Sequence, residues 1–377
     1  MIYRHVCGER ISALGLGAMR LPVMGENNTE INDAAVAEMV AYAMENGINY
    51  YDTAWGYHGG KSEISIGGAL AGYARESFYL ADKFPGYDLA NFGREREIFP
   101  RQLEKCGVSY FDFYLLHNVC EKNIDLYLKH KDALLSYLLE RKKEGAIRHL
   151  GFSVHANTDN MLRFLEAYGE HMEFCQIQLN YLDWNFQAAC EKVEILQGRG
   201  IPIFVMEPVR GGKLATLDEA LMKRLAAYRP NATAAEWAFR FLQGIKGVGV
   251  TLSGMSNMTQ LKENVATFSE DIPVNDAEKK LLFEIADEMV RKIALPCTAC
   301  RYCIEKCPKG LDIPYLLELY NEHSFTEGGF IAPMALEAMP REKHPDACIG
   351  CHSCEKVCPQ GIKIAGAMSY FAAKLRG

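Results

Sequence analysis

Eight short apolar runs, separated by longer amphipathic segments, constrain the fold of this chain more than any other feature of its sequence. The runs lie at 13–19, 48–53, 78–83, 110–117, 148–154, 174–180, 201–207 and 247–253. Helix-like segments between them include 32–46, 62–75, 128–143, 185–199 and 232–243. Strands that alternate with helices pair in parallel, because each crossover helix returns the chain to the same end of the sheet.

About 250 residues of this alternation fit a (β/α)8 TIM barrel, which we predict for the first part of the chain. The alternative is an open, doubly wound sheet, which usually carries a G-x-G-x-x-G turn after its first strand. The corresponding stretch LGLGAMRL, residues 14–21, has two glycines and then departs from that pattern, so the barrel is favoured. Residues 2–12 are expected to form two short strands around Cys7 and Gly8.

Composition excludes several classes of function. The 377 residues are 49% hydrophobic and 24% charged, with a formal net charge of −7. This mildly acidic balance gives no support to binding of nucleic acid or of an anionic membrane. Residues 1–17 lack the apolar run of a signal peptide, and no stretch reaches the roughly 18 apolar residues of a transmembrane helix. We therefore expect a cytoplasmic protein without a membrane partner.

Polar side chains occupy the expected C-terminal ends of the strands, where barrels of this type carry their chemistry. Asp52 ends the second strand and Tyr57 follows it, Lys83 ends the third strand, and His117 ends the fourth. A lysine ammonium lowers the pKa of a nearby phenol, and a carboxylate can hold that lysine charged. A histidine beside the phenol can polarise a carbonyl group that accepts a hydride. Each residue alone would more often be a cap or an ion pair, but the ordered set favours catalysis.

The motifs around these residues resemble those of the aldo-keto reductase superfamily. DTAWGY (52–57), ADKF (81–84) and LLHN (115–118) are similar to its catalytic motifs. Further similar blocks follow the family's order, namely LGLGAMRL (14–21), GFSVH (151–155), QIQLNY (176–181), EPVRGGKL (207–214) and SGMSNMTQLKEN (253–264). The resemblance covers residues 1 to about 290. It implies a barrel that binds NADP or NAD across its C-terminal face, with Tyr57 as the proton donor.

The resemblance also implies which residues contact the cofactor. Ser153 and Gln176 would hold the nicotinamide carboxamide, and the loops 207–214 and 254–264 would hold the pyrophosphate and the adenosine. The expected cofactor-binding residues are Gly17, Asp52, Ser153, His155, Gln176, Met206, Glu207, Pro208, Val209, Arg210, Gly212, Gly254, Ser256, Asn257, Gln260, Glu263 and Asn264. Packing alone would equally explain His155 and would more often explain Met206. We interpret His58 as a solvated loop residue.

Three positions depart from the family pattern. Val154 replaces an asparagine that many relatives carry after the serine of the fifth strand, and Met206 replaces a tyrosine that stacks on the nicotinamide ring. A thioether packs well against an aromatic face, so Met206 is compatible with the same position. Gln260 replaces an arginine, the usual partner of the 2′-phosphate of NADP. The choice between NAD and NADP therefore stays open.

Two cysteine runs near the C-terminus predict a second kind of site. CTACRYCIEKCP (297–308) and CIGCHSCEKVCP (348–359) share the pattern Cys-x2-Cys-x2-Cys-x3-Cys-Pro of two-cluster bacterial ferredoxins, which residues 296–362 therefore resemble. In such domains the fourth cysteine of each run binds the other [4Fe–4S] cluster. We assign one cluster to Cys297, Cys300, Cys303 and Cys358, and the second to Cys348, Cys351, Cys354 and Cys307. Zinc is the alternative, but its sites use pairs of ligands and do not need the third cysteine.

The sequence thus predicts a barrel at 1–292 and a smaller α+β, loop-rich, ferredoxin-like domain at 293–377. We expect an oxidoreductase that reduces an aldehyde or ketone with NADH or NADPH. The clusters either exchange electrons with a partner protein or are structural. The alternatives are a redox relay or sensor, in which the barrel binds nicotinamide or flavin, and a binding module without turnover.

Overall fold

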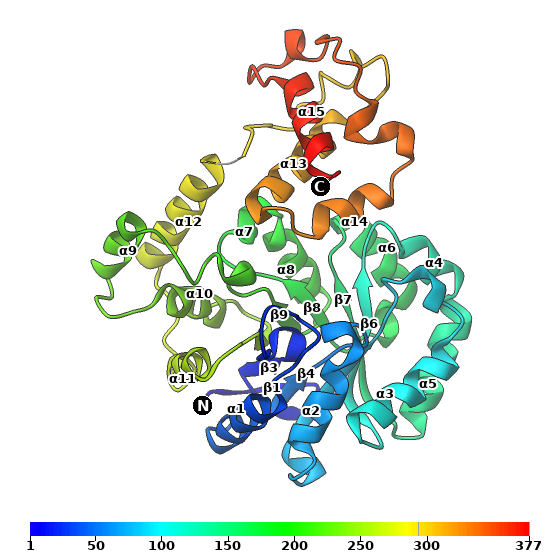
Figure 1. Cartoon of the computed structure of the whole chain (residues 1–377), viewed down its shortest axis with the longest axis vertical. Coiled ribbons are helices and arrows are strands. Elements are labelled where there is room, and N and C mark those ends of the chain that lie inside the picture. The colour runs from blue at the N-terminus through cyan, green and yellow to red at the C-terminus, as the bar shows by residue number, and fades with distance from the viewer. Residues whose placement is uncertain (293, 377) are drawn as a thin grey trace. The chain divides into compact units, whose positions relative to one another are not determined.

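Eight parallel strands close into a barrel, which confirms the predicted fold class (Figure 1). The computed structural model describes residues 1–292 and 294–376. The barrel strands are β3 (Leu14–Gly17), β4 (Tyr50–Asp52), β5 (Tyr79–Phe84), β6 (Phe111–Val119), β7 (Ile147–Val154), β8 (Cys175–Gln178), β9 (Ile203–Met206) and β10 (Val248–Ser253). Each strand overlaps one of the eight apolar runs, and β10 pairs with β3 to close the ring.

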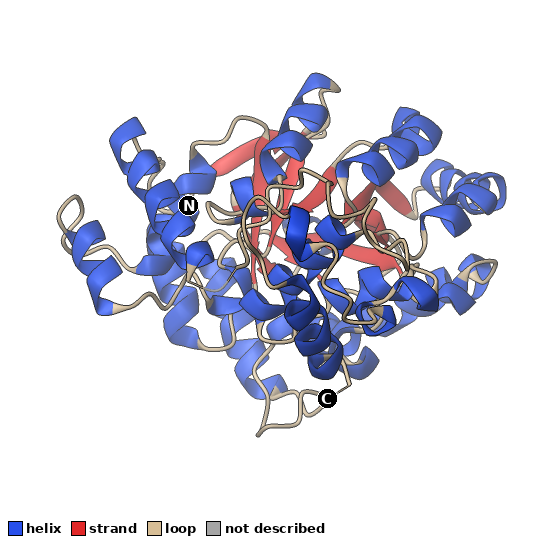
Figure 2. Ribbon diagram, turned by 90° about the horizontal axis from the view of Figure 1, so that it is seen from above, coloured by secondary structure: helices blue, strands red, loops and turns tan. Residues whose placement is uncertain are grey.

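Helices surround the strands of the barrel, as Figure 2 shows with helices in blue and strands in red. They are α1 (Asp33–Glu45), α2 (Ser62–Leu70), α3 (Glu95–Cys106), α4 (Ile124–Lys129), α5 (Lys131–Lys143), α6 (Thr158–Tyr168), α7 (Asp183–Phe186), α8 (Ala189–Gly198), α9 (Glu219–Ala226), α10 (Ala234–Gln243), α11 (Met258–Thr267) and α12 (Asp276–Arg291). Side chains that accept a backbone N–H begin several of them, for example Thr233 at α10 and Asn257 at α11. Such caps satisfy N–H groups that have no partner within the helix.

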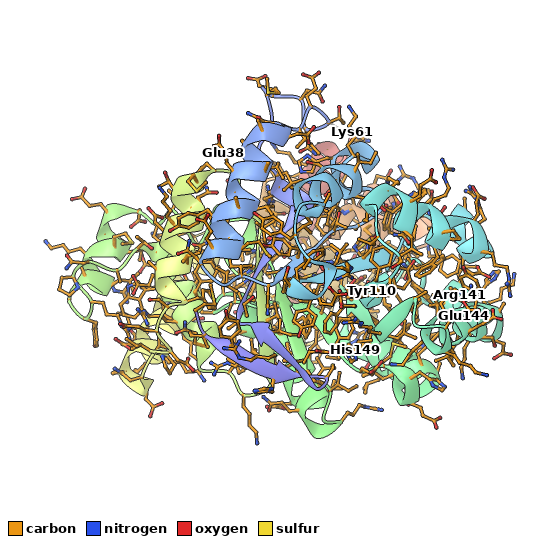
Figure 3. All side chains as sticks on the ribbon, turned by 90° about the horizontal axis from the view of Figure 1, so that it is seen from below. Glu38, Lys61, Tyr110, Arg141, Glu144 and His149 are labelled. Atoms are coloured by element: carbon orange, nitrogen blue, oxygen red, sulfur yellow. The ribbon has the colours of Figure 1, made fainter. Side chains whose placement is uncertain are left out.

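A hairpin closes the floor of the barrel, as the sequence predicts for residues 2–12. β1 (Tyr3–Val6) pairs antiparallel with β2 (Glu9–Ser12), and the intervening Cys7 and Gly8 both have positive φ. This conformation is typical of a two-residue hairpin turn. Val6 and Ile11 pack on the aromatic layer inside the strands. The view from below in Figure 3 shows His149 beside this hairpin, and its ring nitrogen Nε2 lies 3.7 Å from a Glu9 carboxylate oxygen.

A second compact unit begins at Glu284, within α12, and includes Cys120–Asn123. Its further helices are α13 (Ile313–Thr326), α14 (Ile331–Glu337) and α15 (Ile364–Lys374). All regular elements among residues 294–376 are helical, so the strands of the predicted α+β domain are not found there, and long loops carry the cysteines. Leu316, Phe371 and other apolar side chains form a separate core with Cys303 and Cys354. The domain boundary at 292/293 stays a prediction.

No helix in the described part of the chain combines the length and the apolar character that crossing a membrane requires.

Candidate active site and cluster-binding cysteines

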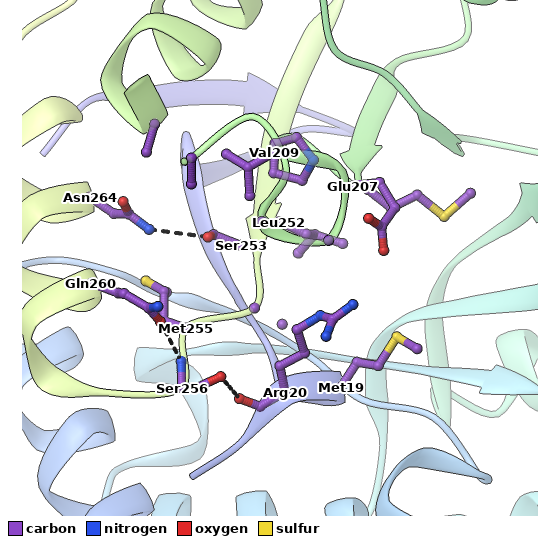
Figure 4. A pocket seen from close by; sticks show the side chains of 18 of the residues that line it. Met19, Arg20, Glu207, Val209, Leu252, Ser253, Met255, Ser256, Gln260 and Asn264 are labelled. Atoms are coloured by element: carbon purple, nitrogen blue, oxygen red, sulfur yellow. Dashed lines mark hydrogen bonds between the residues drawn. The ribbon is translucent and has the colours of Figure 1, made fainter. Parts of the chain in front are cut away.

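A cavity opens at the C-terminal ends of the barrel strands, where the fold class places its chemistry (Figure 4). Loops after β3, β4, β9 and β10 line it. Most of the expected cofactor-binding residues contribute to this lining, namely Gly17, Asp52, Gln176, Met206, Glu207, Pro208, Val209, Gly212, Gly254, Ser256, Gln260, Glu263 and Asn264. Tyr57 lines the same cavity.

A buried ion pair lies beside Tyr57. Lys83 Nζ donates to Asp52 Oδ1 at 2.6 Å and to the Thr53 carbonyl oxygen at 2.6 Å. The side chains of Lys83 and Asp52 are only 1% and 4% exposed. The ammonium also lies 5.0 Å from the centre of the Tyr57 ring. Strands β4 and β5 are neighbours in the barrel, so residues 31 positions apart in the chain meet at their ends.

His117 completes the set of four. Its ring centre lies 6.1 Å from that of Tyr57, and the two rings are nearly perpendicular. Tyr87 also packs edge-on against His117, with the ring centres 5.3 Å apart. The Tyr127 hydroxyl donates to the His117 carbonyl oxygen at 2.8 Å and fixes the backbone there. The structure therefore brings all four predicted catalytic residues together.

Burial changes the acid–base properties of these groups. Burial raises the pKa of Tyr57, and the opposing effect of Lys83 is smaller, so the net direction is opposite to the lowering expected from the sequence. Burial lowers the pKa of Lys83, but Asp52 and Tyr57 more than compensate and raise it overall. Burial, assisted by Lys83, holds the pKa of His117 well below its usual range. At neutral pH the site contains a protonated phenol, an ammonium and a neutral imidazole.

The surroundings of Asp52 have opposing effects on the pKa of its carboxyl. Burial raises the pKa of its carboxyl, whereas the charge and hydrogen bond of Lys83 lower it. The 2.6 Å separation of Nζ and Oδ1 is that of a charge-assisted hydrogen bond, which favours the ionised pair.

Four expected cofactor contacts lie outside the cavity lining. The Ser153 hydroxyl accepts from the Asn118 N–H at 2.8 Å, and the His155 N–H donates to the Val119 carbonyl oxygen at 2.9 Å. Burial lowers the pKa of His155 to about 3, assisted by the charge of Lys192. Asn257 caps α11. These residues support the walls of the cavity, and their direct contact with a cofactor stays a prediction.

Arg210, the fourth of these residues, forms a buried ion pair with Asp183. Asp183 Oδ2 also accepts from Asn180 Nδ2 at 2.6 Å, and the same amide donates to the Glu207 carbonyl oxygen at 3.0 Å. The Arg210–Asp183 ion pair and the Asn180 amide thus fix both ends of the segment 207–210. The loop needs such support because Glu207 and Arg210 have positive φ, which is unfavourable for residues other than glycine.

The cavity has features that fit a nicotinamide dinucleotide. Gln176 Oε1 is buried and has no hydrogen-bond partner in the described structure, so it can accept from a carboxamide N–H. Gly212 and Gly254 lie in the lining, where the absence of a side chain permits close approach of a ligand. The Met206 thioether lines the same wall.

Sequence reasoning missed or misjudged several residues. The interpretation of His58 as solvated is wrong, because its side chain is buried and only 2% exposed. His58 Nε2 accepts from the Leu21 N–H at 3.0 Å, and Nδ1 lies 2.5 Å from the Asn28 carbonyl oxygen. Arg20 lines the cavity and Tyr87 contacts His117, yet neither was singled out. Arg20 lies within the first motif block, residues 14–21, which was a usable signal.

The eight cysteines divide into two sets in the second unit. One cavity is lined by Cys297, Cys300, Cys303 and Cys358, and another by Cys307, Cys348, Cys351 and Cys354. These are the same sets that follow from the crossover of the fourth cysteine. That each set binds a cluster stays a prediction at this point.

The cysteine loops have matching backbone conformations. Ala299 and Arg301 flank Cys300 with positive φ, and Gly350 and His352 flank Cys351 in the same way. Such loops turn successive N–H groups toward a concave site that attracts anions. Among the described residues, no three His, Cys, Asp or Glu side chains approach as closely as a single metal ion requires.

Comparison with protein families identifies the class of this chain. The model of the aldo/keto reductase family matches residues 13–285, and that of a 4Fe-4S dicluster domain matches residues 296–363. The chain therefore belongs to the aldo/keto reductase family of oxidoreductases and carries an additional iron–sulfur domain. Both statements confirm the resemblances found in the sequence.

Individual relatives agree with this assignment. The chain is 24% identical to the NADH-specific methylglyoxal reductase of Escherichia coli over 324 residues, which cover 74% of this chain and 96% of that protein. It is 26% identical to an aldo-keto reductase of a Mycobacterium species over 267 residues, or 70% and 86% of the two proteins.

Solved structures resemble the barrel at similar coverage. The holo form of an aldo-keto reductase from Bacillus halodurans has a TM-score of 0.63 at 23% identity, covering 76% of this chain and 96% of the other. An aldo/keto reductase from Klebsiella pneumoniae, in complex with NADP and acetate, has a TM-score of 0.58 at 20% identity, with the same coverage. At these identities the likeness shows the fold alone.

Proposed function

We propose that this chain reduces an aldehyde or ketone with NADH or NADPH, and that Tyr57 donates the proton. The observation that carries the proposal is the buried Lys83–Asp52 ion pair, whose ammonium lies 5.0 Å from the centre of the Tyr57 ring, next to His117. A bound nicotinamide supplies the hydride for the carbonyl carbon. Tyr57 transfers its proton to the carbonyl oxygen, so hydride and proton together complete a two-electron reduction to the alcohol.

Each of the other residues has a defined part in this proposal. Lys83 stabilises the phenolate that Tyr57 becomes, and Asp52 keeps the lysine charged and in place. His117, as a neutral imidazole, donates a hydrogen bond to the substrate carbonyl. Gln176 would accept from the nicotinamide carboxamide, while the loops 207–212 and 254–264 would hold the rest of the dinucleotide.

The substrate class is part of the same proposal. The Escherichia coli relative is named a methylglyoxal reductase. Small aldehydes and ketones, including 2-oxoaldehydes, are therefore the first substrates to assay. We also infer a cytoplasmic protein, because cluster thiolates persist in a reducing compartment and all 13 cysteines are free in the structure.

A second candidate function is electron exchange through two [4Fe–4S] clusters. The observation that favours it is the gathering of the cysteines into two sets of four, with Cys300 and Cys351 exposed. An exposed ligand places the edge of a cluster within reach of a partner protein. Nicotinamide transfers two electrons as a hydride, whereas a cluster transfers one, so we expect the clusters to exchange electrons with a partner and not with nicotinamide directly.

The test of the carbonyl-reductase proposal is Tyr57→Phe in the whole, anaerobically purified chain. Loss of the proton donor should lower kcat at least 10²-fold, in the range of general acid catalysis, while NADH binding changes little. Tyr228→Phe, which removes an exposed phenol, is the matched control. Retained turnover in Tyr57→Phe would refute the assignment of the proton donor.

A further inference from the structure

Tyr87 places a second phenol beside the proposed proton donor. Its ring packs edge-on against His117, with the ring centres 5.3 Å apart, and the Tyr57 ring packs edge-on against the same imidazole at 6.1 Å. Burial, assisted by the nearby Tyr57 phenol, raises the pKa of Tyr87 to about 12. At neutral pH the Tyr87 hydroxyl therefore carries its proton and can donate a hydrogen bond.

The Tyr87 hydroxyl lies against the backbone that carries Tyr57. Gly56 directly precedes Tyr57, and a Cβ added to Gly56 would collide with this hydroxyl. The side chain therefore reaches from the imidazole of His117 to the turn after β4. In the described part of the chain, no hydrogen bond is found to or from the Tyr87 hydroxyl, although the residue is half-buried. A donor is thus available next to the two residues proposed to act on the substrate carbonyl.

The loop that carries Tyr87 is held in place relative to His117. The Gly86 N–H donates to the Phe84 carbonyl oxygen at 2.8 Å, which turns the chain immediately after β5. A Cβ added to Gly86 would collide with the Tyr127 hydroxyl, and this hydroxyl donates to the His117 carbonyl oxygen at 2.8 Å. Tyr127 therefore packs on the residue before Tyr87 and fixes the backbone of His117. A donor on so well fixed a backbone loses less entropy when it binds a ligand.

The chemistry of the site indicates what this hydroxyl would bind. In the proposed function, Tyr57 and His117 both serve the oxygen that is reduced, so a third donor beside them is available for another oxygen of the substrate. That oxygen must be close to the first, because Tyr87 contacts the His117 ring and the residue before Tyr57. A neutral phenol suits an uncharged oxygen, since a buried carboxylate would require a cation and Lys83 is already paired with Asp52.

We propose that Tyr87 is a specificity-determining residue that donates a hydrogen bond to an uncharged oxygen on the carbon next to the substrate carbonyl. The preferred substrates are then 1,2-dicarbonyl and 2-hydroxycarbonyl compounds. The inference rests on the proposed function, because it requires reduction of a carbonyl beside Tyr57. A site that hydrogen-bonds such an oxygen discriminates against substrates without it, because its own donor is then left unpaired.

The experiment compares methylglyoxal with propanal, which has the same carbon chain but lacks the second oxygen. Steady-state kcat/KM is measured for both aldehydes with the wild-type holoprotein and with Tyr87→Phe, which keeps the ring against His117 and removes only the hydroxyl. Tyr228→Phe, at an exposed position, is the matched control. Each comparison is made between two proteins on one substrate, so hydration of the aldehydes in water cancels. Circular dichroism, cluster absorbance and NADH binding establish that each variant is intact.

We expect Tyr87→Phe to lower kcat/KM for methylglyoxal roughly tenfold and to change kcat/KM for propanal less than about twofold. An equal loss on both substrates would show that Tyr87 acts only by packing on His117 and would overturn the inference. The absence of a loss on methylglyoxal would overturn it as well. In both cases the wild type still reduces a carbonyl, so the proposed function stands.

Two other outcomes are informative. Reduction of pyruvate in preference to methylglyoxal by the wild type would show that the second oxygen belongs to a carboxylate and would overturn the assignment of an uncharged group. Failure of the wild-type protein to reduce any carbonyl would refute the proposed function itself, and with it the premise of this inference.

Discussion

Lys83 Nζ lies 2.6 Å from Asp52 Oδ1 in a site from which solvent is almost wholly excluded. A buried ion pair of this kind contributes little net stability, since desolvation of both charges offsets their attraction. Removal of one partner is costly, however, because it leaves the other charge buried without compensation. The pair is therefore better explained by the charge it maintains beside Tyr57 than by its effect on folding.

Lys83→Met should separate these two effects. Without the ammonium, the Tyr57 phenolate loses its stabilisation, and kcat should fall by about 10²-fold or more. The free energy of unfolding should decrease by roughly 3–5 kcal/mol, because Asp52 is left charged and buried. Urea denaturation and steady-state kinetics measure the two quantities.

The double variant Lys83→Met/Asp52→Asn is the control for this prediction. It should regain most of the lost stability without regaining activity, because neither buried side chain then carries a charge. A double variant as unstable as the single one would show that packing, and not charge, holds the site together. Full activity of Lys83→Met would contradict the role given to the lysine.

The division of the eight cysteines predicts how pairs of substitutions combine. Cys303 and Cys358 line the same cavity, whereas Cys354 and Cys358 line different ones. Cys303→Ser/Cys358→Ser should therefore lose one cluster and retain about half of the iron and sulfide. Cys354→Ser/Cys358→Ser should lose both clusters. Iron and acid-labile sulfide analysis with EPR checks this, and the reverse result would show that the fourth cysteines do not cross over.

The sequence predicted the barrel and the four residues around Tyr57 because both depend on regular features. Strand ends of a parallel barrel meet on one face, so the order of motifs along the chain was enough to bring Asp52, Lys83 and His117 together. The direction of the pKa of Tyr57 could not be predicted in this way. It depends on how completely the phenol is buried, which no local pattern records.

His58 and Arg20 show why the remaining site residues were missed. His58 lies between Tyr57 and two glycines, a context typical of an exposed turn, but its partners Leu21 and Asn28 are 37 and 30 positions away. Arg20 lines the cavity because the segments after β3, β9 and β10 meet there, which the assembled barrel reveals and a single motif does not.

The adenosine end of the cavity predicts a preference for NADH over NADPH. Gln260 and Glu263 both line the cavity, and if the dinucleotide binds as proposed, Gln260 would lie where a 2′-phosphate needs a cation. Gln260→Arg should strengthen NADPH binding roughly tenfold or more, the effect of one charge-assisted hydrogen bond, and leave NADH binding nearly unchanged. Fluorescence titration of both cofactors measures the ratio. Tighter binding of NADPH than of NADH by the wild type would contradict this prediction.

Glu173 on the floor of the barrel predicts how stability depends on pH. Burial raises the pKa of this carboxyl. Hydrogen bonds from His149, Lys142 and the Leu150 N–H lower it by a larger amount, so the pKa is about 2. A carboxyl with a depressed pKa stabilises the fold above its unfolded value of about 4.3, and that contribution is lost as the pH falls toward 2. Because the side chain is 33% exposed, we discount the effect to about 1–2 kcal/mol.

Glu173→Gln should therefore be less stable than wild type by that amount at pH 7, and the difference should shrink steadily between about pH 5 and pH 2. Glu170→Gln is the matched control, since Glu170 is an exposed neighbour in sequence and should change stability little at any pH. Urea denaturation across this pH range, with barrel unfolding followed by tryptophan fluorescence, measures the difference. A difference that stays constant with pH would show that Glu173 acts through packing and not through its charge.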